Sequence, residues 1–264
     1  MLKRIEMARS TYYYNVAHLE TSDKYQAVRK RISEIFVQHH KRYGYRRICA
    51  QLRNEGYVIN HKTVQKLMLE MQLKSVVRKV RYRSYKGEVG RVAANVLERD
   101  FSTYAPNCKW ATDVTEFKIG GRKAHLSPIL DMYNGEIISY TISDSPDLRM
   151  VMNMVNSAIR KAKPQKVLVL HSDQGWHYQH MKYQLALKRN GIIQSMSRKG
   201  NCLDNAMMEN FFGIMKSELL YLQEFKDMDH FKQELKRYIH YYNNDRIKLR
   251  LKGKSPVQYR TLYQ

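Results

Sequence analysis

The sequence is poor in the features that mark secreted or membrane-spanning proteins. Its three cysteines, Cys49, Cys108 and Cys202, are odd in number, far apart and outside any Cys-x-x-Cys pair, which argues against a disulfide framework and a cysteine zinc site. No stretch approaches the roughly 18 to 20 apolar residues that cross a bilayer, and the N-terminus lacks the apolar core of a signal peptide. These absences predict a cytoplasmic protein.

Acidic residues are also scarce, since 24 Asp and Glu face 47 Lys and Arg, a net charge of +23. Such a surplus favours a polyanionic partner, because each phosphate contact releases condensed counterions. Nucleic acid is the leading candidate and an anionic membrane surface the second. The 264 residues, 43% of them hydrophobic, are enough for one large domain or two unequal ones.

The most basic region runs from Lys24 to Lys86, with seventeen Lys or Arg against three acids. Apolar residues recur there at helical spacing in three short stretches, which Gly44 and Gly56 separate. This pattern predicts a helix-turn-helix-like DNA-binding domain over residues 23–74. The alternative is a helical hairpin whose basic face is only solvated.

Residues 75–106 lose this periodicity and become basic and aromatic, most clearly from Arg78 to Gly87. We interpret the segment as a linker that lies along DNA. An ordinary flexible connector that happens to be basic has the same composition, and the sequence leaves both readings open.

The pattern changes again after residue 107. We expect strands at 110–118, 124–132, 136–142, 166–170 and 191–196, and helices at 148–162, 178–189 and 204–220. Three strands in succession followed by alternating helices and strands predict an α/β domain with a mixed sheet over residues 107–222. A helix near 228–242 and a basic tail make up residues 223–264.

Three acids lie on three of these elements. Asp113 is inside the first strand-like run, Asp173 follows an apolar strand, and Glu209 is on a helix. Carboxylates that converge from separate elements suit Mg²⁺ or Mn²⁺, and two such ions about 4 Å apart stabilise both oxygens of a phosphoryl displacement. Taken singly, each acid has a simpler explanation as an exposed strand residue, a turn or cap residue, or a solvated helix residue.

Histidine and tryptophan give weaker signals. His171, His177 and His180 lack paired cysteines, so we predict packing or polar contacts for them and no structural zinc. Trp110 and Trp176 are candidates either for stacking on bases or for packing in the core.

Several motifs together resemble the transposases of the bacterial IS-three family, a branch of the integrase-like superfamily with a ribonuclease H-like catalytic core. The match covers nearly the whole chain, and 35 residues separate Asp173 from Glu209, as in the family's acidic triad. The motifs that carry the resemblance are Tyr43–Ile48, Trp110–Asp113, His171–Gly175 and Ser197–Ala206.

The resemblance implies a catalytic and metal-binding role for Asp113, Asp173 and Glu209. Asp113 would bridge two Mg²⁺ or Mn²⁺ ions, and the other two acids would complete their separate shells. Lys216 matches a basic residue that contacts terminal DNA, although a surface lysine is the simpler reading of its spacing. The other residues that we expect to contact DNA are Arg46, Arg47, Arg81, Arg83, Arg198 and Lys199. The acids that match no catalytic position are Glu116, Asp131, Asp204 and Glu218.

The function that follows is 3′-end cleavage and strand transfer of an insertion sequence by a homo-oligomer on nucleoid DNA. Residues 1–22 resemble the end of a longer DNA-binding segment. In this family the active enzyme is commonly a fusion made by ribosomal frameshifting from two reading frames, and this chain resembles the product of the second frame. Two alternatives stay open. One is a non-catalytic DNA-binding regulator, and the other is a tyrosine recombinase, which the 20 tyrosines permit and which would form a covalent phosphotyrosine link.

Overall fold

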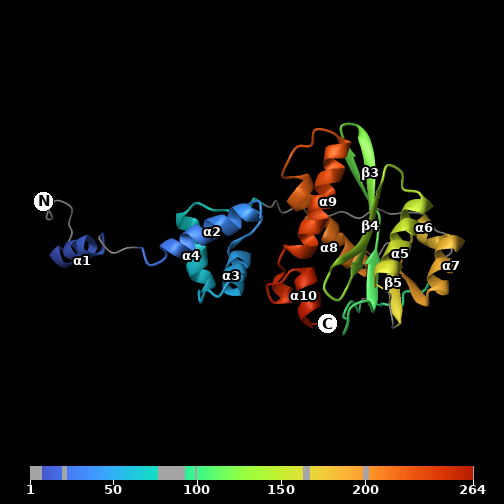
Figure 1. Cartoon of the computed structure of the whole chain (residues 1–264), viewed down its shortest axis with the longest axis horizontal. Coiled ribbons are helices and arrows are strands. Elements are labelled where there is room, and N and C mark those ends of the chain that lie inside the picture. Colours follow the sequence, from blue (N-terminus) through green and yellow to red (C-terminus); the bar gives the residue numbers. More distant parts are fainter. Residues whose placement is uncertain are drawn as a thin grey trace. The chain divides into compact units, whose positions relative to one another are not determined.

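The computed structural model describes residues 8–19, 23–76, 93–98, 100–162, 167–198 and 202–263. The chain divides into two compact units, Met1–Ser75 and Val76–Gln264 (Figure 1). None of the helices in the described ranges is both long enough and apolar enough to cross a membrane.

The first unit is helical, and its apolar positions explain why. It contains α1 (Arg9–Leu19), α2 (Gln26–Gln38), α3 (Tyr45–Asn54) and α4 (His61–Glu70). The last three helices share a small core built from the residues whose spacing predicted them: Ile32, Ile35, Phe36, Ile48, Leu52, Val64, Leu67 and Met68. Gly56 ends the turn after α3 with φ at +91°, a conformation that glycine adopts without strain. The three-helix prediction is confirmed.

The second unit is built on one mixed sheet. Its strands are β1 (Lys109–Thr112), β2 (Thr115–Ile119), β3 (Arg122–Asp131), β4 (Ile137–Ser143), β5 (Leu168–Ser172) and β6 (Ile192–Met196). β3 pairs antiparallel with β1, β2 and β4, whereas β5 pairs parallel with both β1 and β6. Gly120 and Gly121 turn β2 back into β3 with positive φ at both positions, as a two-residue hairpin requires. The prediction of a mixed sheet is confirmed.

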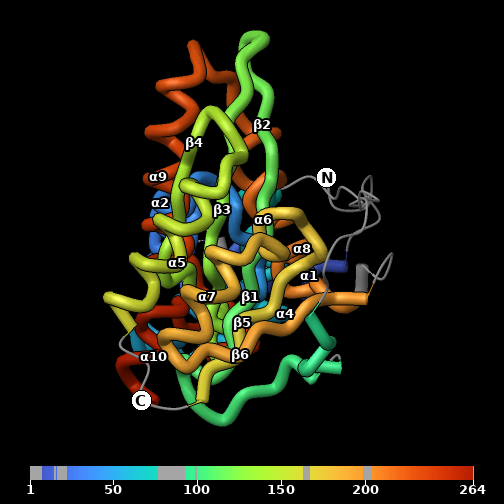
Figure 2. The backbone as a smooth tube through the Cα atoms, turned by 90° about the vertical axis from the view of Figure 1, so that its right-hand side faces the viewer, coloured from blue at the N-terminus to red at the C-terminus, as the bar shows by residue number. Residues whose placement is uncertain are grey.

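Helices cover both faces of this sheet, so the unit has three layers (Figures 1 and 2). On one face, α5 (Leu148–Ala162), α6 (Trp176–Gln179) and α7 (Met181–Arg189) bury a core with Trp110 and Leu170. On the other face, α8 (Ala206–Met215) and α9 (Met228–Asn244) bury a second core with Ala111 and Leu130. Successive strand residues point to opposite faces, which explains why Trp110 and Ala111 belong to different cores.

The helices differ from the predicted ones in two places. The helix expected at 178–189 is divided at His180, whose backbone is extended and whose side chain accepts a hydrogen bond from the Lys182 N–H. The helix expected at 204–220 consists of a 3-10 turn η2 (Cys202–Asn205), α8 and a π-helical turn η3 (Lys216–Leu220). π-Helical turns are rare in proteins, and those that occur are often at functional sites. This one follows the helix that carries Glu209.

The basic tail is folded. It contains a short 3-10 turn η4 (Leu249–Leu251) and α10 (Pro256–Tyr263). Arg260 of α10 forms ion pairs with Asp131 at 2.6 Å and with Glu136 at 2.7 Å. Because Asp131 ends β3 and Glu136 precedes β4, the C-terminal helix is joined to the sheet through these charges.

Candidate active site

Asp113 lies in a short break between β1 and β2, so the prediction of one continuous strand was wrong at this residue. Both strands pair with β3 in one register, in which Thr112 faces Ile129 and Asp113 therefore comes opposite Pro128. Proline has no N–H to give to a ladder, and the Thr112 hydroxyl donates to the Pro128 carbonyl at 2.9 Å. The break thus follows from Pro128, which is near Asp113 in the sheet and distant in sequence.

The Asp113 carboxylate is held by two hydrogen bonds. Oδ1 accepts from the N–H of Val114 at 2.7 Å, and Oδ2 accepts from the side-chain amide of Asn205 at 3.1 Å. Burial raises the pKa of Asp113 well above its usual value, and the charges of Asp173 and Glu209 raise it further. The Asp113 carboxyl group is therefore close enough to both of the other predicted acids for their charges to act on it.

Asp173 follows β5 directly, at the same edge of the sheet as Asp113. The adjacent parallel strands β1 and β5 place Ala111 beside His171, so each acid comes two residues after this pair. The N–H of Gly175 donates to Asp173 Oδ1 at 2.9 Å. Burial raises the pKa of Asp173, and the Gly175 hydrogen bond opposes that shift.

Glu209 lies in the first turn of α8 and is partly buried. Burial raises the pKa of its carboxyl group. Phe212, three residues after Glu209, is in the core. The residues that α8 buries are Met208, Phe211, Phe212 and Met215. The apolar residues of α8 itself lie on most sides of the helix, so helical spacing alone does not identify the side that faces the core.

Lys216 begins the π-helical turn, seven residues after Glu209. Its ammonium group lies 5.9 Å from the centre of the Phe117 ring. Burial lowers the pKa of Lys216, and the nearby charge of Asp113 acts in the opposite direction. The structure thus brings this cation within electrostatic reach of the first acid.

The three acids are partly buried, and they differ from the buried acids of this unit in having no ion-pair partner among the described residues. The buried carboxylates of Asp204 and Glu218 pair with Arg198 at 3.0 Å and Arg246 at 2.7 Å, and Asp131 pairs with Arg260. No three His, Cys, Asp or Glu side chains in the described ranges are arranged to hold a metal ion together as they stand. Among the residues that the structure describes, these carboxylates have no cation that neutralises their charge by direct pairing.

The predicted DNA-contact residues are in several places. Arg46 is exposed on α3, and the Arg47 guanidinium lies 5.4 Å from the centre of the Tyr43 ring. Arg198 is ion-paired to Asp204 while its side chain is 58% exposed. The remaining predicted residues, Arg81, Arg83 and Lys199, lie outside the described residues.

The histidines each make a separate polar contact. His171 is buried, and its Nδ1 lies 2.9 Å from the Ser195 hydroxyl. His177 Nε2 lies 2.6 Å from the Pro146 carbonyl oxygen, and His180 begins α7, as described above. The three side chains therefore serve three different local structures.

The two tryptophans also differ. Trp110 is fully buried in the core on the α5 face, which leaves no face of its ring for a base. Trp176 is 55% exposed, and its ring centre lies 4.0 Å from that of His177. Only the second ring remains a candidate for stacking on DNA.

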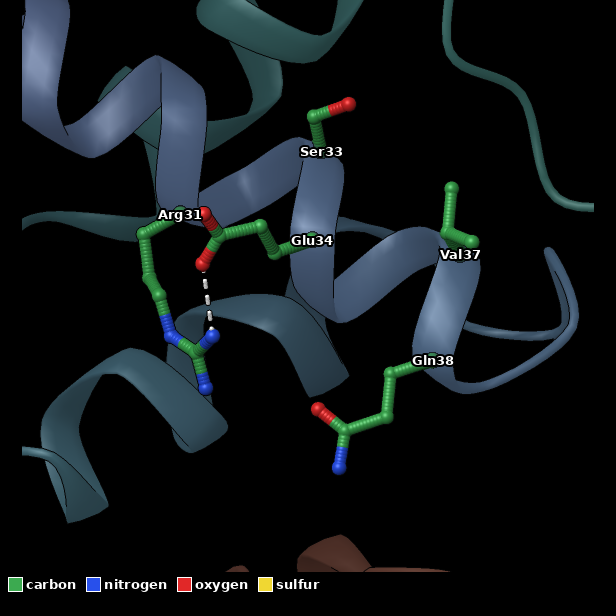
Figure 3. Close-up of a pocket in the computed structure, with 5 residues that line it drawn as sticks. All are labelled: Arg31, Ser33, Glu34, Val37 and Gln38. Atoms are coloured by element: carbon green, nitrogen blue, oxygen red, sulfur yellow. Dashed lines mark hydrogen bonds and ion pairs between the residues drawn. The ribbon is translucent and has the colours of Figure 1, made fainter.

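A surface hollow in the first unit lies along α2 (Figure 3). Arg31 and Glu34 in its wall form an ion pair at 2.8 Å. The lining residues are Arg31, Ser33, Glu34, Val37 and Gln38. None of the residues predicted to act in catalysis or DNA binding lines this hollow.

Sequence reasoning did not single out Asn205 as a site residue, although it lies within a motif that carried the resemblance. Its contact with Asp113 crosses from η2 to the end of β1. An asparagine before a helix is ordinarily a capping residue, so the local pattern gave no signal for this longer contact.

Known proteins similar to this chain agree on its type. Residues 103–202 and 209–262 match family models described as an integrase core domain, and residues 24–81 match one described as an HTH-like domain. The putative transposase InsK for insertion sequence element IS150 of Escherichia coli (strain K12) is 53% identical over 98% of this chain and 92% of that protein. An uncharacterized transposase-like protein of Haemophilus influenzae is 50% identical over 78% of this chain and 95% of that protein.

A solved structure is also similar. The catalytic core domain of HTLV-2 integrase, in complex with magnesium, matches with a TM-score of 0.47 and 18% identity over 60% of this chain and 99% of that chain.

Proposed function

This chain belongs to the IS3 and IS150 family of insertion-sequence transposases, and we propose that Asp113, Asp173 and Glu209 carry out its chemistry with divalent metal. The protein is a DNA transposase with an integrase core and an HTH-like DNA-binding domain, and so an enzyme of the polynucleotidyl transferase type. The observation that carries the proposal is the electrostatic environment of the Asp113 carboxyl group. Burial and its two acidic neighbours raise its pKa, and among the described residues no cation forms an ion pair with it.

The donor set fits Mg²⁺ or Mn²⁺, because both prefer oxygen ligands and a divalent ion would favour the ionised form of carboxyl groups whose pKa values burial raises. We propose two ions, with Asp113 a ligand of both and Asp173 and Glu209 each a ligand of one. When bound, the ions would make a water molecule or a 3′-hydroxyl more acidic, and so a better nucleophile, and would neutralise charge on the reacting phosphate.

The reaction that we propose has two displacements at phosphorus. In the first, a water oxygen bonds to phosphorus at the end of the element, and the P–O bond to the 3′ oxygen breaks and leaves a 3′-hydroxyl. In the second, this hydroxyl attacks a target phosphodiester, and one P–O bond forms as another breaks. We infer that Lys216 offsets phosphate charge beside Asp113, since a partly buried ammonium interacts more strongly with an anion than an exposed one does.

The test is cleavage and strand transfer on a DNA duplex that carries the ends of the element encoding this chain, with Mg²⁺ or Mn²⁺. We expect Asp113→Asn, Asp173→Asn and Glu209→Gln each to abolish both steps while the proteins stay folded. Glu116→Gln is the matched control, because Glu116 is on the neighbouring strand β2 and its contacts are with Lys123 and His125. Full activity in any of the three triad variants would remove that residue from the proposal.

The same assay distinguishes the alternative of a non-catalytic regulator. DNA binding that persists in EDTA, with no cleavage in any divalent metal, would favour that function. We also expect a homo-oligomer on DNA and a first-reading-frame partner, which sedimentation of the chain with end DNA, alone and with the upstream product, would test.

A further inference from the structure

Asn205 occupies the N-cap position of α8, but its side chain does not cap the helix. Asparagine is among the best capping residues, because its side-chain oxygen accepts a free N–H of the first turn. Here the side-chain amide donates instead to Asp113 Oδ2 at 3.1 Å. The side chain therefore contacts Asp113 and does not cap the helix.

The other end of the same amide is without a partner. Asn205 is 6% exposed, and its Oδ1 is buried with no hydrogen bond in the described structure. An unsatisfied buried acceptor costs about 1–3 kcal/mol. Turning the amide over would place its carbonyl oxygen against Asp113, which in the ionised form that binds a cation has no hydrogen to donate. The contact with Asp113 therefore fixes the orientation of the amide.

The backbone that carries Asn205 is fixed by its neighbour Asp204. The buried Asp204 carboxylate accepts hydrogen bonds from the side chain of Asn95, from the N–H of Arg198 and from the Arg198 guanidinium, each at 3.0 Å. These contacts join the segment before the sheet, the loop after β6 and the start of α8. Asn205 is thus attached to a rigid support beside the helix that carries Glu209.

We propose that Asn205 is a positioning residue for Asp113. Its Nδ2–H fixes the rotation of the Asp113 carboxylate and ties the end of β1 to the start of α8, so that Asp113 keeps the orientation needed to bind a divalent cation. This inference rests on the proposed metal site at Asp113.

The experiment measures Mn²⁺ binding to the full chain without DNA, by electron paramagnetic resonance of free Mn²⁺, alongside thermal unfolding. We expect Asn205→Ala to weaken Mn²⁺ binding about 10- to 100-fold, the usual effect of losing a hydrogen bond to a metal ligand. Asn205→Ser, which restores a good N-cap residue but cannot reproduce the amide, should weaken binding as much.

Asn134→Ala is the matched control, since Asn134 is a fully buried asparagine of the same unit that bonds to Glu136 and the Pro256 carbonyl. It should lower the melting temperature and leave Mn²⁺ affinity unchanged. If Asn205→Ala also lowers only the melting temperature, its role is structural and the inference is overturned.

An Asp113→Ala variant separates the two proposals. If the unmodified chain binds no Mn²⁺, or Asp113→Ala binds it equally well, the proposed metal site fails and the inference fails with it. If Asp113→Ala loses binding while Asn205→Ala and Asn205→Ser bind Mn²⁺ like the unmodified chain, only the positioning role fails.

Discussion

Glu218 and Arg246 form a buried ion pair with two contacts, each at 2.7 Å, and both side chains are 3% exposed. The Tyr238 hydroxyl donates a third hydrogen bond to Glu218 at 3.1 Å. The pair joins the π-helical turn after α8 to the segment that follows α9. The helix that carries Glu209 is thereby fixed from its C-terminal side.

Removal of Arg246 tests this link. Arg246→Met should lower the free energy of unfolding by about 3–5 kcal/mol, because it leaves the Glu218 carboxylate buried and uncompensated. The double variant Glu218→Leu, Arg246→Met should recover most of this loss. Urea unfolding measures both. The control is Arg237→Met, which breaks an exposed pair with Glu234 and should cost about 0–1 kcal/mol; equal losses in the two single variants would contradict the prediction.

Asp113→Asn should stabilise the metal-free protein while it abolishes cleavage. The substitution removes a charge that burial and two acidic neighbours disfavour and keeps the size of the side chain. We expect the melting temperature in EDTA to rise by a few degrees, since about 1 kcal/mol corresponds to roughly 2–4 °C in a protein of this size. Asp229→Asn, at a site whose side chain is 72% exposed, should leave it unchanged, and a lower melting temperature for Asp113→Asn would count against the prediction.

The free energy of unfolding should also depend on pH because of Asp113. The raised pKa of Asp113 means that the folded state holds its proton more tightly than the unfolded state. Stability should therefore fall as pH rises from the ordinary aspartate pKa of about 3.9 towards the raised value, and the loss is complete above it. The difference in free energy of unfolding between the unmodified chain and Asp113→Asn, measured by urea from pH 4 to 8 in EDTA, isolates this group. A difference that does not change with pH would show that the Asp113 pKa is unshifted.

Arg46→Ala should weaken DNA binding by the first unit. Arg46 is exposed on α3, and its guanidinium lies 5.6 Å from the centre of the Tyr45 ring. If Arg46 contacts a phosphate, affinity should fall for all duplexes, and the slope of log affinity against log salt should become about 1 unit shallower. Lys30→Ala, an equal charge loss on α2, is the control for net charge. If Arg46→Ala and Lys30→Ala give the same slope of log affinity against log salt, the prediction that Arg46 contacts a phosphate is wrong.

The sequence pattern predicted the elements best where each element depends on its own residues. The helix expected at 148–162 has those bounds in the structure, because its apolar positions repeat with a single helical period. Asp173 also lies where the pattern placed it, since a strand rich in apolar residues ends just before it. Local periodicity and strand-end position were sufficient for these features.

Features that depend on distant contacts gave no such signal. The break at Asp113 needs Pro128, which is on another strand, and the tether from Asn205 crosses between two elements. The helix α10 is joined to the sheet through the charges of Asp131 and Glu136, and from the residues around Arg260 alone we predicted only a basic tail. In each case the partner is supplied by the topology of the sheet, which a local pattern does not contain.

The central position of β1 also sets when this protein is able to become active during its own synthesis. Trp110 pairs with Leu170 of β5, and the helix that carries Glu209 is made later still. A ribosome must release the chain beyond α8 before the three proposed catalytic acids can meet. Until that point in synthesis, the proposed site cannot form, whatever the state of the first unit.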